Sequence, residues 1–151
     1  MKALTCIAAA TTLVALTAPV AAQFAKPEDA IKYRQSAMFI QSQHFGRIGA
    51  MVSGKAPFDA AVAADNAAIV ADMSKLPWAG FMPGTDKGGN TKAKPEIWTE
   101  QEKFKETNEK LMAETAKLAA AAKTGNLDTL KAAFTATADT CKSCHDAFRN
   151  K

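Results

Sequence analysis

Apolar residues recur at helical spacing along most of this chain, and Pro, Gly and Asn separate the stretches. In residues 27–54, Ile31, Met38, Phe45 and Val52 recur every seven residues, which places them on one helix face. No segment after the first 22 residues shows the sustained alternation of a half-buried strand. Four such stretches, the first and last pairs joined by short connections, predict an all-α fold: an antiparallel, up-down-up-down four-helix bundle.

The second helix is expected to open at Pro57-Phe58-Asp59 and to stop at Pro77, because proline cannot continue a helix. Its predicted buried stripe consists of Val62, Asn66, Ile69, Met73 and Leu76. Asn66 lies on that stripe, so it should be hydrogen-bonded if it is buried. The connection over residues 78–94 is rich in Gly and Pro, which predicts no regular element there.

The third helix is predicted to start at Pro95-Glu96, with a capping box between Thr99 and Glu102. Its stripe consists of Phe104, Asn108, Leu111, Thr115, Leu118 and Ala122. Gly125 and Asn126 indicate a stop and restart before the fourth helix, over 127–148.

Residues 1–22 have the pattern of a secretory signal peptide. Lys2 precedes an apolar run over residues 3–18, and small residues favour cleavage before Gln23. A transmembrane anchor is the alternative, but the run is short for a bilayer span. We therefore expect export to the periplasm, no membrane span after cleavage, and one domain over residues 23–151.

The expected domain carries little net charge. Removing Lys2 from the 19 basic residues leaves 18 against 15 acidic ones, a net charge of +3. The basic residues are scattered rather than clustered, so the sequence does not indicate nucleic-acid binding.

The last helix ends in a C-x-x-C-H sequence. Cys141, Cys144 and His145 stand at i, i+3 and i+4, which places all three on one helix face. Two thiols there can add to the two vinyl groups of a haem, and the imidazole can reach the iron from the same side. The pattern predicts one covalently attached haem c per chain, with His145 as the iron ligand.

Other uses of this cysteine pair fit the sequence less well. A disulfide between them would close a very small loop and constrain little. A thioredoxin-like site requires a βαβ context, and a structural zinc site requires four ligands. The only other histidine is His44, which we interpret as a surface or subunit-contact residue.

The chain resembles cytochrome c′ and its relatives, bacterial cytochromes that carry the haem motif near the C-terminus. The matching segments are K-P-E-D-A-I-K-Y-R-Q-S-A at 26–37, H-F-G-R at 44–47, L-P-W-A-G-F at 76–81, P-G-T at 83–85, K-P-E-I-W at 94–98 and C-K-S-C-H-D-A-F-R at 141–149. The resemblance implies a left-handed four-helix bundle with the haem near one end. It also implies a homodimer that packs through the first two helices.

The resemblance assigns roles to several residues. Cys141 and Cys144 match the thioether positions, and His145 matches the proximal ligand. Arg34 and Gln35 match a pair near the haem propionates, where an arginine fork suits a carboxylate.

Two further matches complete the predicted site. Arg149 matches a basic residue on the proximal side, where it can influence arriving ligands. Thr91, in the long connection, is expected to bond a propionate.

Met38 matches the residue over the distal face of the iron. If its thioether does not bind, the haem is five-coordinate and takes small gases such as nitric oxide and carbon monoxide while undergoing one-electron redox. If it binds, the protein is a low-spin electron carrier. The likeness of the first helix and of the Trp78 connection to cytochrome c′ favours the five-coordinate, gas-binding interpretation. The sequence leaves the periplasmic electron partner unidentified.

A haem enzyme is a third class. The sequence shows no nucleophile–base pair, and a distal pocket without a histidine suits peroxide chemistry poorly. We therefore do not expect an enzyme.

Overall fold

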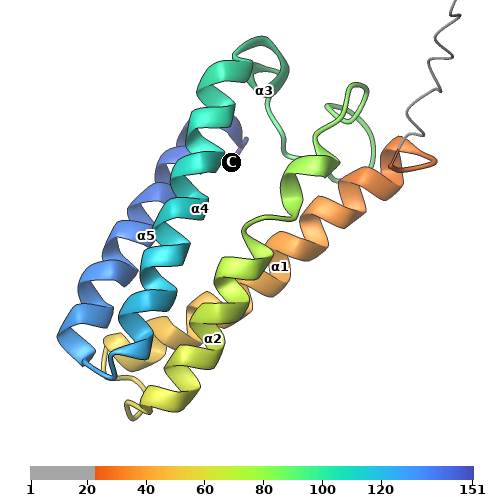
Figure 1. Cartoon of the computed structure of the whole chain (residues 1–151). Coiled ribbons are helices and arrows are strands. Elements are labelled where there is room, and N and C mark those ends of the chain that lie inside the picture. The colour runs from red at the N-terminus through yellow and green to blue at the C-terminus, as the bar shows by residue number, and fades with distance from the viewer. Residues whose placement is uncertain (1–22) are drawn as a thin grey trace, which may run out of the picture.

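The computed structural model describes residues 23–151, and the predicted signal peptide lies outside them. The elements are α1 (Pro27–Val52), α2 (Ala60–Met73), the 3-10 helix η1 (Pro77–Gly80), α3 (Glu96–Thr99), α4 (Gln101–Lys123) and α5 (Leu127–Phe148). The four long helices run antiparallel to their neighbours along the chain (Figure 1). The predicted all-α up-down-up-down bundle is confirmed. None of the helices in this described part is long and apolar enough to cross a membrane.

One end of the bundle is closed by a tightly packed core. Its buried members are Ile48, Met51, Ala63, Ala67, Val70, Leu118, Ala122 and Leu130. Leu118 is fully buried, and removing a side chain of that size from water stabilises the fold by about 2 kcal/mol. Gly125 turns the chain between α4 and α5 at a φ of 68°, a conformation that strongly favours glycine.

Side chains define the start of two long helices. The Asp59 side chain accepts a hydrogen bond from the Val62 N–H at 3.0 Å and caps α2. The Asn126 side chain does the same for the Thr129 N–H at 2.9 Å and caps α5.

The predicted capping box between Thr99 and Glu102 does not form. Thr99 is the last residue of the short helix α3, and Glu100 precedes α4 without a side-chain cap. The break at Glu100 turns α3 away from α4, and Ile97 is buried against Phe104 at the open end of the bundle. Packing of Ile97 therefore overrides the local capping signal.

The predicted buried stripe of α2 is right only in part: Asn66 is buried, and Ile69 and Met73 are half-buried. Val62 is 46% exposed and Leu76 is 36% exposed, whereas Ala63, Ala67 and Val70 are buried. Small alanine side chains let a helix approach its neighbours closely, so the alanine face of α2 is the one that packs.

Asn66 is buried and hydrogen-bonded, as expected. Its Nδ2 donates to the Val62 carbonyl oxygen at 2.7 Å, and its Oδ1 lies 2.8 Å from His44 Nδ1. His44 is thus half-buried and joins α1 to α2 rather than standing free on the surface.

Candidate functional site

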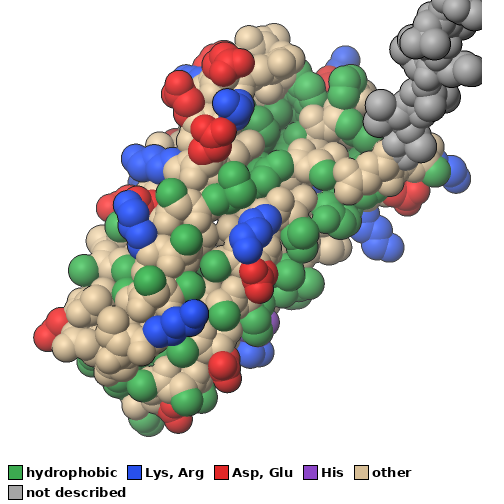
Figure 2. Space-filling model, viewed as in Figure 1, with side chains coloured by type: hydrophobic (Ala, Val, Ile, Leu, Met, Phe, Trp, Pro, Cys, Tyr) green, Lys and Arg blue, Asp and Glu red, His purple; other side chains and the backbone are tan. Residues whose placement is uncertain are grey.

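The opposite end of the bundle contains a cavity of about 650 Å³. Its walls come from α1, α4, α5 and the connection between α2 and α3, and most of the surface is apolar. Figure 2 shows hydrophobic side chains gathered where α4 and η1 face each other at this end. A cavity of this size and character suits a largely apolar ligand.

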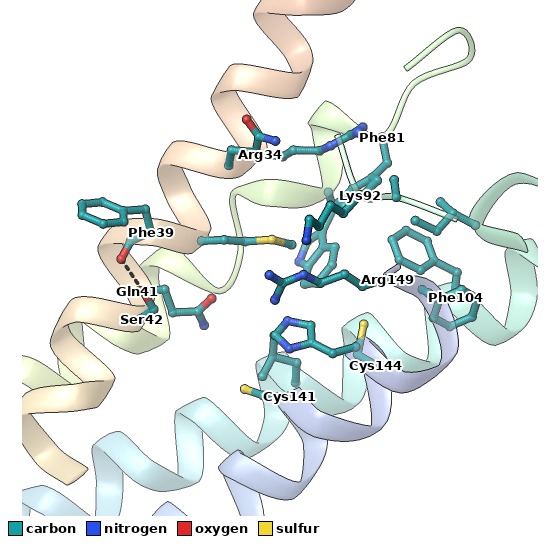
Figure 3. Close-up of a pocket in the computed structure, with 18 of the residues that line it drawn as sticks. Arg34, Phe39, Gln41, Ser42, Phe81, Lys92, Phe104, Cys141, Cys144 and Arg149 are labelled. Atoms are coloured by element: carbon teal, nitrogen blue, oxygen red, sulfur yellow. Dashed lines mark hydrogen bonds between the residues drawn. The ribbon is translucent and has the colours of Figure 1, made fainter. Parts of the chain in front are cut away.

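Helix α5 places the C-x-x-C-H residues on the cavity wall. Cys141, Cys144 and His145 all line it, and both cysteines are half-buried and unbridged. Figure 3 shows the two thiols on the turn of α5 that borders the cavity. The predicted sharing of one helix face is confirmed by this placement.

The environment keeps these groups neutral. Burial raises the pKa of Cys144 to about 11, with a smaller contribution from the neighbouring Cys141, and burial also raises the pKa of Cys141. Desolvation lowers the pKa of His145, and the positive charge of Arg149 lowers it further. A neutral imidazole is the form that binds a metal.

Aromatic rings build the wall beside α5. The Phe104 ring lies 5.0 Å from the Phe81 ring and 5.2 Å from the Phe148 ring, each pair edge to face. Trp78 lies 5.9 Å from Phe104 in the same arrangement. Edge-to-face pairs stabilise one another, so these rings pack as one continuous wall of the cavity.

Arg34 lines the cavity, but its guanidinium is occupied by the connection after α2. Its two Nη atoms donate at 2.7 Å to the Gly80 carbonyl oxygen, to Thr85 through both Oγ1 and the carbonyl oxygen, and to Thr91 Oγ1. The side chain is 3% exposed, and burial lowers its pKa to about 10. The Nη hydrogens that would form the predicted carboxylate fork are therefore used within the protein.

Gly80 makes this arrangement possible. A Cβ at this position would lie 2.6 Å from the Ala30 carbonyl oxygen and 2.9 Å from Arg34 Cβ. Only glycine lets η1 sit directly on α1, where its carbonyl meets the arginine. The sequence presented Gly80 merely as a residue that interrupts regular structure, and the prediction of no regular element after Pro77 was wrong for residues 78–80.

The remaining predicted site residues also lie at the cavity. Gln35, Met38, Thr91 and Arg149 are all part of its lining. Gln35 Nε2 donates to Asn90 Oδ1 at 3.1 Å. Cavity-facing residues that the sequence analysis missed include Asn90 and Lys92, which carry no motif and face the cavity only through the course of the connection.

A short backbone pairing joins this connection to the chain after α5. Ala93 forms an antiparallel bridge with Arg149. The Lys94 N–H donates to the Phe148 carbonyl oxygen at 3.0 Å, and the Asn150 N–H donates to the Lys92 carbonyl oxygen at 2.8 Å. The bridge therefore holds the connection against the end of the helix that carries the C-x-x-C-H residues.

Comparison with known proteins decides the family. Residues 29–149 match the family described as Cytochrome C′. This chain belongs to the cytochrome c′ family. Cytochrome c′ of Rubrivivax gelatinosus is 54% identical over 129 residues, which cover 85% of this chain and all of the relative. Cytochrome c′ of Alcaligenes xylosoxydans is 49% identical over 129 residues, covering 85% of this chain and 99% of the relative.

Solved structures of cytochromes c′ share the fold. The Rubrivivax gelatinosus crystal structure superposes with a TM-score of 0.82 at 53% identity, covering 85% of this chain and all of the other. A nitric oxide complex of a cytochrome c prime mutant from Alcaligenes xylosoxidans gives a TM-score of 0.79 at 49% identity, covering 85% and 99%. The four-helix architecture is thus that of the family.

The cofactor of this family is a covalently attached haem c, and the residues of this cavity fit it. Two thiols and a neutral imidazole lie on one wall, and aromatic rings suit a flat macrocycle. Three basic residues and no Asp or Glu line the cavity, which suits the two propionates. When bound, the haem supplies an iron that changes oxidation state and binds small molecules.

Proposed function

We propose that this protein is a periplasmic cytochrome c′ with a five-coordinate haem, which binds nitric oxide and carbon monoxide and undergoes one-electron redox. The α1 wall of the cavity carries this proposal. Met38 and Phe45 line it, but no histidine does, because the one histidine of α1 is bonded to Asn66. The protein then offers one imidazole, His145, and the α1 side of the cavity, which Met38 and Phe45 line together with Gln35, Gln41 and Ser42, offers no second one to a bound iron. The nitric oxide complex of the relative supports gas binding.

The alternative function is a low-spin electron carrier. Met38 is half-buried and lines the cavity, so its thioether can serve as the sixth ligand or as an apolar filler. If the thioether is the sixth ligand, gases would have to compete with it for the iron and would bind poorly.

Optical and electron paramagnetic resonance spectra of the purified ferric and ferrous protein, with and without carbon monoxide, distinguish the two. A high-spin ferric signal with ready carbon monoxide uptake is expected. A low-spin signal with a sulfur-to-iron charge-transfer band and no uptake would overturn the five-coordinate proposal in favour of the carrier.

The Met38→Ala variant provides a second test of the five-coordinate proposal. Because the shorter side chain widens the apolar side of the cavity, we expect carbon monoxide to bind about tenfold faster, which corresponds to ~1.4 kcal/mol in the barrier. Unchanged spectra and unchanged rates would show that Met38 does not lie over the iron.

We propose that turnover of a substrate is not part of this function, because the residues that line the cavity include no general acid–base pair. The relatives are named cytochrome c′, and one solved relative is a nitric oxide complex. Export rests on the sequence of residues 1–22, and N-terminal sequencing of the secreted protein tests it. An N-terminus at Gln23 is expected, and an intact Met1 would contradict export by this route.

A homodimer through α1 and α2 is also proposed. Phe39, Ile40 and Val62 are 63%, 42% and 46% exposed, which gives this pair of helices an apolar outer surface. Sedimentation velocity of the protein and of Ile40→Lys tests the interface. Dimers that become monomers on substitution are expected, and a monomeric unsubstituted protein would refute it.

A further inference from the structure

The end of α5 is capped by one residue from a distant part of the chain. The last four carbonyl groups of a helix have no partner within that helix, and in α5 they belong to residues 145–148. The first of them accepts the N–H of the residue after the helix at 3.1 Å. Lys94 takes the other three. Its Nζ donates to the carbonyl oxygens of Asp146 and Ala147 at 2.9 and 3.3 Å, and its N–H donates to that of Phe148 at 3.0 Å.

The local sequence prepares Lys94 for this position. Pro95 follows it, and a residue before proline favours extended backbone. Extended backbone continues the pairing of Ala93 with Arg149, so the Lys94 N–H meets the end of α5. The Lys94 carbonyl oxygen also accepts from the Ile97 N–H at 3.2 Å, which ties the same residue to the start of α3. Lys94 is half-buried and does not line the cavity, so it acts on the helix and not on an occupant of the cavity.

A cationic cap suits the end of a helix. The carbonyl ends of the peptide dipoles carry partial negative charge there, and a lysine both neutralises that charge and donates to the oxygens. The apolar side of the same turn is held by the cluster in which Phe148 is buried and on which Ala147 and Cys144 pack. The last turn of α5 is therefore fixed from its apolar side by this cluster and from its polar end by Lys94.

His145 lies in that last turn. Its imidazole lines the cavity, and no hydrogen bond to another residue of the described part of the chain holds the ring. The direction of the ring then depends on the backbone that carries it. Helix ends fray when their carbonyl groups lack partners, and fraying of this turn would move His145.

We propose that Lys94 is a positioning residue, which caps the last turn of α5 and thereby sets the direction in which His145 presents its imidazole to the haem iron. The inference rests on the proposed function, because it requires a haem whose iron His145 binds. Lys94 acts through the backbone of α5 and contacts neither the imidazole nor the cavity.

The test compares the unsubstituted holoprotein with Lys94→Met, Lys94→Arg and Lys142→Met. Lys94→Met keeps the apolar stem and the backbone N–H and loses only the Nζ donors, whereas Lys94→Arg keeps both donors and charge. Lys142→Met is the matched control, because Lys142 is an exposed lysine of α5 that pairs with the Asp146 side chain and not with a helix carbonyl group. If Lys94→Met does not fold, Lys94→Gln, which keeps a neutral donor, takes its place.

Three measurements follow on each protein. The pyridine haemochrome spectrum should show full covalent haem in all of them, because the cysteines are unchanged. Hydrogen exchange over residues 145–149 should be about tenfold faster in Lys94→Met, a loss of ~1.4 kcal/mol in the free energy of local opening. The hyperfine-shifted β-proton NMR resonances of His145 in the ferric protein report the orientation of its side chain whether or not Met38 binds the iron. They should move in Lys94→Met and stay in place in Lys94→Arg and Lys142→Met.

Two results would overturn the inference while leaving the proposed function intact. One is faster exchange in Lys94→Met with unchanged His145 resonances, since Lys94 would then only stabilise the helix end. The other is an equal change in Lys142→Met, which would assign the effect to the loss of any positive charge near α5. Absence of haem in the unsubstituted protein would instead refute the proposed function, and the exchange comparison would still test the cap.

Discussion

The two ends of the bundle differ in packing: one is filled by side chains, and the other surrounds a cavity. At the closed end, alanines and branched side chains bring the helices together and leave no room for a ligand. At the open end, Ile97, Phe104 and Phe148 form a small cluster, and rings line the space rather than fill it. The closed end contributes stability through buried apolar area, whereas the open end depends on a polar anchor at Arg34 to hold its connection. Stability and binding are thus separated along one set of helices.

The largest effect should come from removing the attachment points at the open end. In the double variant Cys141→Ser and Cys144→Ser, no thioether can form, so we expect loss of nearly all covalent haem. Haem staining of a denaturing gel measures it. The control is Ser143→Ala, an exposed substitution between the two cysteines. Full covalent haem in the double variant would contradict attachment through these two cysteines.

The closed end should show the largest loss of stability. Leu118→Ala removes a fully buried side chain and leaves a cavity, so the free energy of unfolding should fall by about 3 kcal/mol. Val62→Ala, on the exposed face of α2, should cost less than about 1 kcal/mol. Chemical denaturation of both proteins checks this. Equal losses would mean that the core does not lie where the fold places it.

A smaller effect is expected where η1 meets α1. Gly80→Ala places a Cβ against the Ala30 carbonyl oxygen and should cost about 2 kcal/mol. Gly46→Ala, where a Cβ meets nothing within 4 Å, should stabilise α1 by about 0.5–1 kcal/mol. Hydrogen exchange should show faster exchange at Thr85 and Thr91 in Gly80→Ala only. Unaltered exchange there would argue against the Arg34 anchor.

The smallest expected effect is electrostatic. Because the charge of Arg149 lowers the pKa of His145, Arg149→Gln should make the imidazole easier to protonate. Acid then competes earlier for His145, so its detachment from the haem iron should occur at a higher pH. An acid titration followed by absorption measures the midpoint, with Lys151→Gln as the control. A midpoint that stays constant or falls would contradict this influence.

Local patterns predicted the helices well and the packing only in part. The positions of α1 and α5 and the buried stripe of α4 follow from helical periodicity, which needs no knowledge of the neighbours. The stripe of α2 was wrong at Val62 and Leu76, and it left out the buried alanines because alanine carries little hydrophobic signal. The capping box at Thr99 failed because burial of Ile97 outweighs one hydrogen bond at a helix end.

By itself, the sequence determined the helical bundle and the common face of Cys141, Cys144 and His145, since both follow from spacing within one helix. Only the tertiary structure decided what the basic residues do. Arg34 donates to carbonyl and hydroxyl oxygens of a connection 46 to 57 residues away, which the sequence did not predict. A backbone bridge pairs Ala93 with Arg149, and the Asn150 N–H donates to the Lys92 carbonyl oxygen, although these segments are distant in the sequence. Contacts between residues so far apart along the chain depend on the tertiary fold, which local sequence patterns do not predict.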